Sequence, residues 1–175
     1  MSSDTPTTPV TPVISVDGLE FKPRPEAWKP RGAAADKFDV ARARVGERLG
    51  LTKIGINVTQ VAPGRTGYPF HSHRANDELF YIVSGSGTLR LGAQRLPVKA
   101  GDLIGCPVGG PETAHQLINT GSVPLKYLSI SSNFDPDICE YPDSGKVGAY
   151  AGDDPKSGLV HLSRYGDARD YWDGE

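Results

Sequence analysis

Short apolar segments separated by turns dominate the middle of the chain. Residues 54–61 alternate apolar and polar positions and stop at Pro63-Gly64. Residues 78–83 are β-branched and aromatic, and a Ser/Gly turn joins them to a return strand at 88–91. The same pattern predicts further strands at 94–98, 103–106, 115–119 and 125–131. Strands this short, with turns every 8 to 12 residues, predict an all-β sandwich or barrel over residues 51–132.

The segments on either side of this region lack the strand pattern. Residues 1–12 are rich in Thr, Pro and Ser and are expected to be disordered. Residues 13–50 are expected to form an extended arm and a short helix over 33–49, although the second half of that helix could equally open a strand. Residues 133–175 are acidic and rich in Gly, Asp and Pro, which predicts an irregular tail that could be partly disordered beyond residue 151.

Composition supports a single β-rich domain. Gly (21) and Pro (15) make up 36 of the 175 residues, about a fifth, against an average of about 12%. Both residues are unfavourable inside helices, which argues against a helical bundle. A membrane partner is not expected either, because the apolar runs are far shorter than the roughly 20 residues of a membrane-spanning helix.

Charge and cysteine content bear on partners and compartment. A net charge of -2 gives no sign of nucleic-acid binding, which usually requires a strongly basic surface. The two cysteines form no disulfide framework, and the first residues have neither the basic nor the apolar region of a signal peptide. We therefore expect a reducing cytoplasm as the location.

Histidines carry the clearest chemical signal. Only four are present, and two of them, His71 and His73, are separated by one residue. Alternate residues of a strand point to the same face, so both imidazoles can reach one metal ion. Glu78 follows at the start of the next apolar strand, and His115 begins another strand. His161 lies in the acidic tail and is expected to be a surface residue.

This set of side chains suits one divalent transition metal ion. Three imidazoles and one carboxylate are typical ligands of Fe, Mn, Ni, Co or Zn. Four protein ligands leave coordination positions open if the ion is five- or six-coordinate, as in a catalytic site. Two alternatives are that Glu78 only orients a histidine, or that the four side chains are simply hydrogen-bonded polar residues.

The spacing of these residues resembles the cupin superfamily. His71, His73, Glu78 and Gly85 match the first cupin motif: His-x-His, four residues, Glu, six residues, Gly. Gly101, Pro107 and Gly109 match the second motif, and His115 and Asn119 keep its His-x-x-x-Asn spacing. Five residues separate Gly109 from His115, where the family has two. The resemblance covers about residues 50–132.

The resemblance implies a double-stranded β-helix barrel around one metal ion, preceded by the arm and followed by the tail. Within the superfamily the chain looks most like small single-domain bacterial cupins that are compared with phosphomannose isomerase and sugar-phosphate isomerases. Small cupin dimers that exchange arms are similar, so we expect a homodimer. The arm at residues 13–21 could then pair with a neighbouring subunit's sheet.

We interpret the protein as a metal-dependent cupin that acts on a small polar metabolite. An isomerase could use the metal as a Lewis acid, with Glu78 as the only candidate catalytic carboxylate. Substrate contacts are expected from Arg65 and Gln60, which lie near the motifs, and from Phe80, which shares the strand face of Glu78. An Fe(II) dioxygenase and a non-catalytic metal- or metabolite-binding protein are alternatives, because the fold does not select the reaction.

Overall fold

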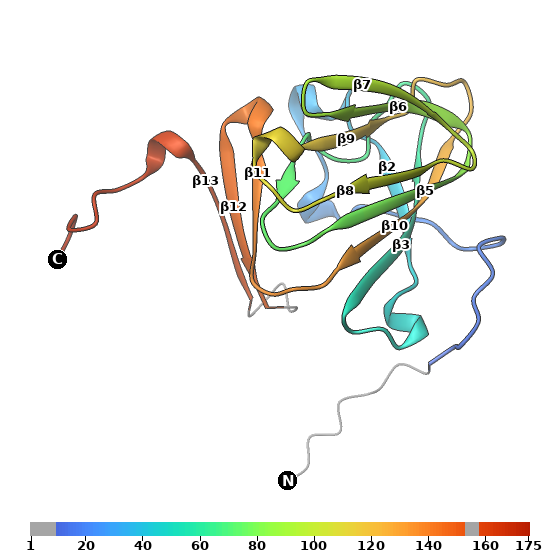
Figure 1. Cartoon of the computed structure of the whole chain (residues 1–175), viewed down its shortest axis with the longest axis horizontal. Helices are drawn as coiled ribbons and strands as arrows, with labels where there is room; N and C mark the ends of the chain where they lie inside the picture. The colour runs from blue at the N-terminus through green and yellow to red at the C-terminus, as the bar shows by residue number, and fades with distance from the viewer. Residues whose placement is uncertain (1–9, 153–157) are drawn as a thin grey trace, which may run out of the picture.

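The computed structural model describes residues 10–152 and 158–175, which form thirteen strands and six short 3-10 helices (Figure 1). The strands are β1 (Lys22–Pro23), β2 (Val40–Arg44), β3 (Ile54–Val61), β4 (Ser72–His73), β5 (Glu78–Ser84), β6 (Ser86–Leu91), β7 (Gln94–Lys99), β8 (Leu103–Cys106), β9 (His115–Ile118), β10 (Leu125–Ser132), β11 (Asp137–Tyr141), β12 (Lys146–Ala151) and β13 (Leu159–Arg164). The 3-10 helices are η1 (Glu26–Trp28), η2 (Gly32–Ala34), η3 (Glu47–Leu49), η4 (Pro111–Thr113), η5 (Pro142–Ser144) and η6 (Tyr165–Asp167).

Three antiparallel sheets build the molecule. The largest has the order β1-β2-β3-β10-β5-β8, a second has the order β7-β6-β9, and a third has the order β13-β12-β11-β4. The main buried core combines residues of the first two sheets: Val40, Val61, Phe80, Ile82, Leu89, Val98, Ile104, Cys106, Leu117, Leu125 and Tyr127. The predicted all-β fold, a double-stranded β-helix barrel, is confirmed.

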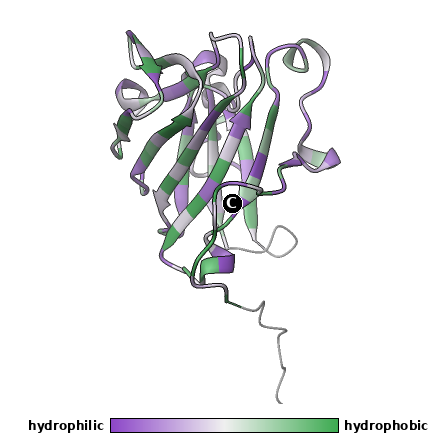
Figure 2. Ribbon diagram, turned by 90° about the vertical axis from the view of Figure 1, so that its right-hand side faces the viewer, coloured by the Kyte–Doolittle hydropathy of each residue, from purple (hydrophilic) through white to green (hydrophobic). Residues whose placement is uncertain are grey.

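Alternation along the strands separates the interior of the barrel from its surface. In β5, Phe80 and Ile82 are buried in the core, whereas Leu79 and Tyr81 are exposed. Figure 2 shows the same alternation as green and purple bands along several strands. Because successive side chains of a strand point to opposite faces, Glu78 shares the inward face with Phe80.

The turn between β5 and β6 requires glycine. Gly85 has a φ of 82°, in the left-handed region that residues with a Cβ atom rarely adopt. A Cβ atom at this position would also lie 2.6 Å from the carbonyl oxygen of Pro124. This glycine therefore allows β5 and β6 to pass close to the loop before β10.

Residues 33–49 contain no α-helix, so the expected helix is wrong and the strand alternative is correct. β2 pairs with β3 along its whole length. Its apolar side chains alternate between two cores: Val40 faces the barrel, and Ala43 faces outward. Pairing with β3 thus stabilises the strand that the two-residue alternation allows. The competing helical pattern is weak because Gly46 and Gly50 interrupt it.

The N-terminal arm packs on the outer face of this chain's own sheet. Four of its apolar residues, Ile14, Val16, Leu19 and Phe21, cover a small core formed by Ala43, Val45 and Val58. β1 then pairs with β2 at the sheet edge. The disorder expected for residues 1–12 concerns mainly residues 1–9, which lie outside the described residues. Val10 is exposed, and Thr11 donates a backbone hydrogen bond to Arg48.

The expectation of an irregular tail is wrong, because residues 137–164 contribute three strands. Gly145, with a φ of 60°, makes the turn between β11 and β12, and β11 pairs with β4 on its other edge. The charged residue Glu140 weakens the strand pattern in the sequence. Glu140 is nevertheless buried, with its carboxylate accepting hydrogen bonds from Arg74 and Tyr165. Such pairing offsets the cost of burying a charge.

Beyond β13 the chain extends away from the body (Figure 1). The end of this segment carries exposed Tyr171 and Trp172. None of the helices in the described residues has the length and apolar character needed to cross a membrane.

Candidate metal centre

Separate segments of the chain position the three histidines and the glutamate. His71 and His115 form a bridge of two backbone hydrogen bonds, 3.2 and 2.8 Å long, which joins the segment before β4 to the start of β9. His73 ends β4 and pairs with Cys139 of β11. Glu78 is the first residue of β5. The backbone pairing of these strands fixes where each side chain begins, which makes the arrangement rigid.

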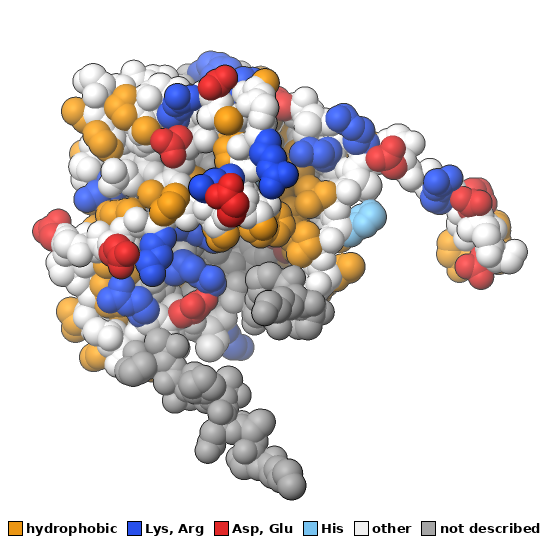
Figure 3. Space-filling model, turned by 180° about the vertical axis from the view of Figure 1, so that it is seen from behind, with side chains coloured by type: hydrophobic (Ala, Val, Ile, Leu, Met, Phe, Trp, Pro, Cys, Tyr) orange, Lys and Arg blue, Asp and Glu red, His pale blue; other side chains and the backbone are white. Residues whose placement is uncertain are grey.

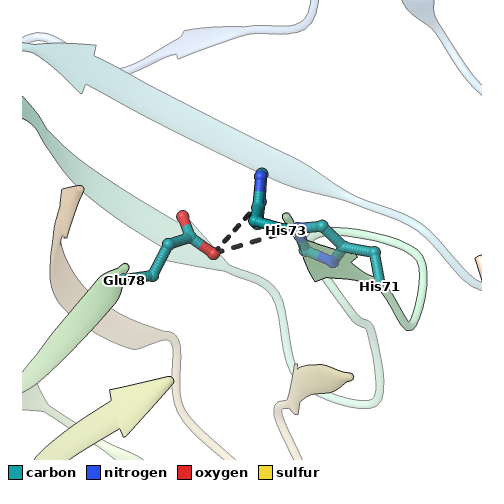
Figure 4. A group of neighbouring side chains, drawn as sticks. All are labelled: His71, His73 and Glu78. Carbon is teal, nitrogen blue, oxygen red and sulfur yellow. Dashed lines mark ion pairs between the residues drawn. The ribbon is translucent and has the colours of Figure 1, made fainter. Parts of the chain in front are cut away.

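The imidazoles converge on a single carboxylate oxygen. Nε2 of His115 lies 2.7 Å from Oε2 of Glu78, and the corresponding distances are 3.5 Å for His73 and 3.9 Å for His71. Figure 4 shows the last two pairs from the side. Only the contact with His115 is short enough for a hydrogen bond. The other two imidazoles therefore point at Glu78 without bonding to it.

The opposite nitrogen of each imidazole is held by an oxygen atom. Nδ1 of His71 lies 2.8 Å from the carbonyl oxygen of Pro69, and Nδ1 of His73 lies 2.6 Å from Oδ2 of Asp137. Nδ1 of His115 lies 3.4 Å from the carbonyl oxygen of Thr113. In the neutral imidazole each Nδ1 can then donate its proton to oxygen, and the lone pair of each Nε2 faces the common centre.

These residues fit a divalent transition metal ion. Histidine ligands of metals typically donate their second ring nitrogen to a carboxylate or a backbone carbonyl, which fixes the tautomer and the ring orientation. His71 and His73 have such a partner at a short distance, and His115 has a longer contact with a backbone carbonyl. The ligand atoms of His71, His73 and Glu78 lie within 4.8 Å of one another. Two nitrogens and one carboxylate oxygen thus lie close enough to hold one ion, and Nε2 of His115 adjoins them through its contact with Glu78.

Protonation in the metal-free protein follows from burial and from these contacts. Burial, together with the positive charge of His115, lowers the pKa of His71 to about 4. Burial lowers the pKa of His115, but hydrogen bonding to Cys106 and Glu78 outweighs it and raises this pKa to about 10. Burial raises the pKa of Glu78, but the hydrogen bond with His115 and the neighbouring histidines bring it down to about 2. At neutral pH, His115 and Glu78 thus form an ion pair, and a bound cation would replace the shared proton.

A second group of potential ligands, His73, Asp137 and Cys139, adjoins the first. It would use Nδ1 of His73, which is already paired with Asp137. Burial and the negative charge of Asp137 also raise the pKa of the Cys139 thiol to about 12, so the thiolate that metals bind is disfavoured. The Nε2 side of His73 is the better metal site.

A cavity of about 350 Å³ lies against the histidines. The cavity is lined by strands of the largest sheet and of the third sheet, β13-β12-β11-β4. Its walls comprise Arg42, Asn57, Tyr68, His71, His73, Glu78, Phe80, Ser129, Asp137, Cys139, Tyr141 and Tyr150. The cavity is large enough for a small molecule and gives it access to two imidazoles and to Glu78.

The expected substrate residues divide into two groups. Phe80 lines the cavity, and its ring lies 5.6 Å from that of His115. Arg65 lines a different depression, beside η2, where its guanidinium binds the carbonyl oxygen of Asp36. Gln60 lies on β3 between Thr59 and Val61, both fully buried in the barrel, so its side chain points to the opposite face. Neither Arg65 nor Gln60 therefore lines this cavity, and contact of these two residues with substrate stays a prediction.

Several cavity residues escaped prediction because they lie on strands that the sequence did not reveal. Asp137, Cys139 and Tyr141 alternate along β11, and Arg42 is on β2. The spacing of two residues in β11 was the available signal, since such residues share one face. Tyr141 is also stacked near His71, with ring centroids 6.1 Å apart, and its hydroxyl lies 2.7 Å from that of Tyr150.

The two cysteines and His161 differ in their exposure to solvent. Cys106 is buried in the barrel core, and Cys139 is also buried with a free thiol. His161 is exposed on β13.

A family comparison and two relatives agree with this structure. Residues 57–131 match the family model of the Cupin domain. An uncharacterised protein of Methanocaldococcus jannaschii is 39% identical over 72 residues, which are 41% of this chain and 48% of that protein. An oxalate-binding protein of Thermotoga maritima is 29% identical over 68 residues, which are 39% of this chain and 54% of that protein. The chain thus matches only about half the length of these curated relatives.

Solved structures extend the similarity beyond the matched domain. A proposed sugar phosphate isomerase of Acidithiobacillus ferrooxidans has a TM-score of 0.67 and 29% identity, covering 75% of this chain and 80% of its own. A sugar phosphate isomerase from a cupin superfamily, from Silicibacter pomeroyi, has a TM-score of 0.73 and 22% identity, covering 93% and 98%. The second similarity concerns the fold alone and includes most of this chain.

Proposed function

From the premise that this chain contains a cupin domain, we propose that it is a metal-dependent protein that acts on a small polar metabolite. His71, His73, Glu78 and His115 would hold one divalent transition metal ion. The observation that carries the proposal is the orientation of the histidines. Each Nε2 faces Glu78, and each Nδ1 lies near an oxygen atom.

The reaction that we propose is isomerisation of a hydroxy-carbonyl compound such as a sugar phosphate. The similarity at 29% identity to a proposed sugar phosphate isomerase supports this class. A metal ion bound at this site would supply Lewis-acid polarisation of substrate oxygens. Isomerisation also needs groups that accept and donate protons, and these must come from the cavity walls.

Glu78 is our candidate for the catalytic proton acceptor. It would act through the carboxylate oxygen that does not hold the metal ion, and it lies at the wall of the cavity. The tyrosine pair is the candidate for donation. Burial, together with the hydrogen bond that its hydroxyl donates to Tyr150, raises the pKa of Tyr141, so its hydroxyl keeps its proton at neutral pH. The hydroxyl of Tyr150, whose proton the mutual hydrogen bond does not use, can then donate to a substrate oxygen from the wall formed by β11 and β12.

A second candidate function is binding without catalysis. The similarity to an oxalate-binding protein favours it, since oxalate is a small polar ligand of the size that this cavity could take. Turnover distinguishes the two candidates. Chemical conversion of a bound hydroxy-carbonyl compound supports the isomerase, whereas tight binding across a broad panel of compounds with no conversion supports the binder.

The homodimer and the cytoplasmic location are also proposals. Leu79, Tyr81 and Leu103 are exposed on the outer face of β5 and β8, where a second copy could cover them. The two free, buried cysteines are compatible with a reducing compartment.

Elemental analysis of untagged protein tests the metal site. We expect about one equivalent of a transition metal in the unmodified chain and loss of it in the double variant His71→Ala/His73→Ala. His161→Ala is the matched control, because it removes an exposed histidine from β13. Retention of the metal by the folded double variant would refute the site.

A further inference from the structure

Arg42 is an arginine on the inward face of a barrel strand. It lies two residues after Val40, which packs in the barrel core, and one residue before Ala43, which packs under the N-terminal arm. Alternation therefore directs Arg42 to the interior. It lines the same cavity as His71 and Glu78 and is half-buried.

The guanidinium of Arg42 is unpaired within the described residues. Among residues 10–152 and 158–175 it makes neither a hydrogen bond nor an ion pair. Several other arginines of the described chain are paired, among them Arg44 with Glu47, Arg90 with Asp143, and Arg24 with the carbonyl oxygen of Gly67. A partly desolvated charge is costly without a partner, so this position is suited to a ligand anion.

The acids that line the cavity do not fill this role. Glu78 is engaged with His115, and Asp137 with His73. The side chains on the strands between Arg42 and Glu78, Asn57 of β3 and Ser129 of β10, are polar and neutral. The cavity thus has a free positive group at one end and the candidate metal ligands at the other.

From this arrangement we infer that the ligand carries a terminal phosphate or carboxylate, which Arg42 binds. The inference rests on the proposed function, because it assigns the opposite end of the same ligand to the metal site. β2 and β5 are separated by β3 and β10, so three strand spacings place their backbones about 14 Å apart. The side chains of Arg42 and Glu78 both point into this interval and shorten it. A ligand of several carbon atoms, with an oxygen-rich end and an anionic end, fits the space.

Arginine is well suited to this task. Its planar guanidinium binds phosphate or carboxylate through two parallel hydrogen bonds. Arg42 also borders an outer groove lined by Lys22, Arg44 and Arg48. Figure 3 shows Lys and Arg side chains on the rear face of the molecule, with Asp and Glu side chains among them. Positive charge around this end of the cavity would raise the local concentration of anions.

Calorimetric binding to the metal-loaded full chain tests the inference. The probes are inorganic phosphate, glycerol 3-phosphate, glycerate and glycerol, of which the last three share one carbon skeleton. We expect the anionic compounds to bind more tightly than glycerol. Tighter binding of glycerol 3-phosphate would assign phosphate as the natural group, and tighter binding of glycerate would assign carboxylate.

Variants then identify the residue. Arg42→Gln should weaken binding of the preferred anion by at least about tenfold, because a charge-assisted pair of hydrogen bonds is lost. Arg42→Lys should retain part of the affinity, since it keeps the charge and loses the two-bond geometry. Arg95→Gln is the control, because it removes one positive charge from an exposed position on β7 outside the cavity, and it should bind like the unmodified chain.

Equal anion affinity in the unmodified chain and in both Arg42 variants would overturn the inference. So would the absence of any preference for the anions over glycerol. The metal content of each sample is measured as well. A sample that holds metal but shows no role of Arg42 contradicts only the anion site, whereas a sample without metal contradicts the metal site. Inorganic phosphate binding is also measured in the metal-free His71→Ala/His73→Ala variant. If that binding depends on Arg42, the anion site is supported even if the metal proposal fails.

Discussion

Replacing Asp137 tests whether His73 is oriented for a metal ion. Oδ2 of Asp137 lies 2.6 Å from Nδ1 of His73, and Oδ1 accepts a hydrogen bond from the backbone of Ala75 at 3.0 Å. Burial raises the pKa of Asp137, but hydrogen bonds from Asn76 and His73 outweigh it and keep the pKa below its usual value. The carboxylate is therefore charged at neutral pH and holds the Nδ1 proton of His73, so that Nε2 remains free.

The size of the effect follows from the two contacts. Asp137→Asn keeps one oxygen that can accept from His73, but it removes the charge and turns an amide toward the backbone of Ala75. Loss of such a partner of a histidine ligand typically lowers metal affinity by about 10- to 100-fold, or about 1.4 to 2.7 kcal/mol. Asp137→Ala removes both contacts and should reach the upper end of this range.

A competition assay with a chromophoric zinc chelator measures the affinity. Asp143→Asn is the control, because Asp143 lies just beyond β11 and pairs with Arg90 instead of a histidine. The variants should keep their folded state, as judged by circular dichroism. If Asp137→Asn and Asp137→Ala bind zinc as tightly as the control, the hydrogen bond to His73 does not support a metal ligand and the reasoning is refuted.

Two further predictions concern stability. In the metal-free protein the pKa of His71 is about 4, against 6.5 in the unfolded chain, so the unfolded state binds more protons between these values. The free energy of unfolding should therefore fall on acidification from pH 6.5 toward 4, by up to about 1.4 kcal/mol per pH unit. Urea titrations at a series of pH values measure this slope. An equal slope in the His71→Gln variant would contradict the prediction. Gly85→Ala should destabilise the protein by about 1 to 3 kcal/mol, because it combines a positive φ with a clash against Pro124. Gly101→Ala, where φ is also positive but nothing lies within 4 Å, should cost less in the same urea titration, and equal losses would exclude the clash as a cause.

The barrel and the histidine cluster were accessible from sequence because each depends on local rules. Period-two alternation, as in Phe80 and Ile82, marks strands with one buried face, and glycine turns such as Gly85 separate them. His71 and His73 share a face by the same rule. These signals do not depend on which strands become neighbours in space.

The far wall of the cavity could not be predicted in the same way. β11 owes its stability to pairing with β4 and β12 and to the ion pair between Glu140 and Arg74, which lie 66 residues apart. Long-range pairing of this kind leaves little trace in local composition. For the same reason, Arg65 lies near the motifs in the sequence but not in the cavity. The local pattern also did not show that Arg42, on the inward face of β2, would line the cavity.

X-ray absorption spectroscopy of the zinc-loaded protein tests the metal centre most directly. Zinc–nitrogen and zinc–oxygen bonds are about 2.0 to 2.2 Å long, whereas zinc–sulfur bonds are about 2.3 Å. Ligation by His71, His73, Glu78 and His115 predicts a shell of nitrogen and oxygen atoms with the multiple-scattering signature of three imidazoles. A sulfur shell from Cys139, or scattering from a single imidazole, would place the metal in the neighbouring group and contradict the proposed site.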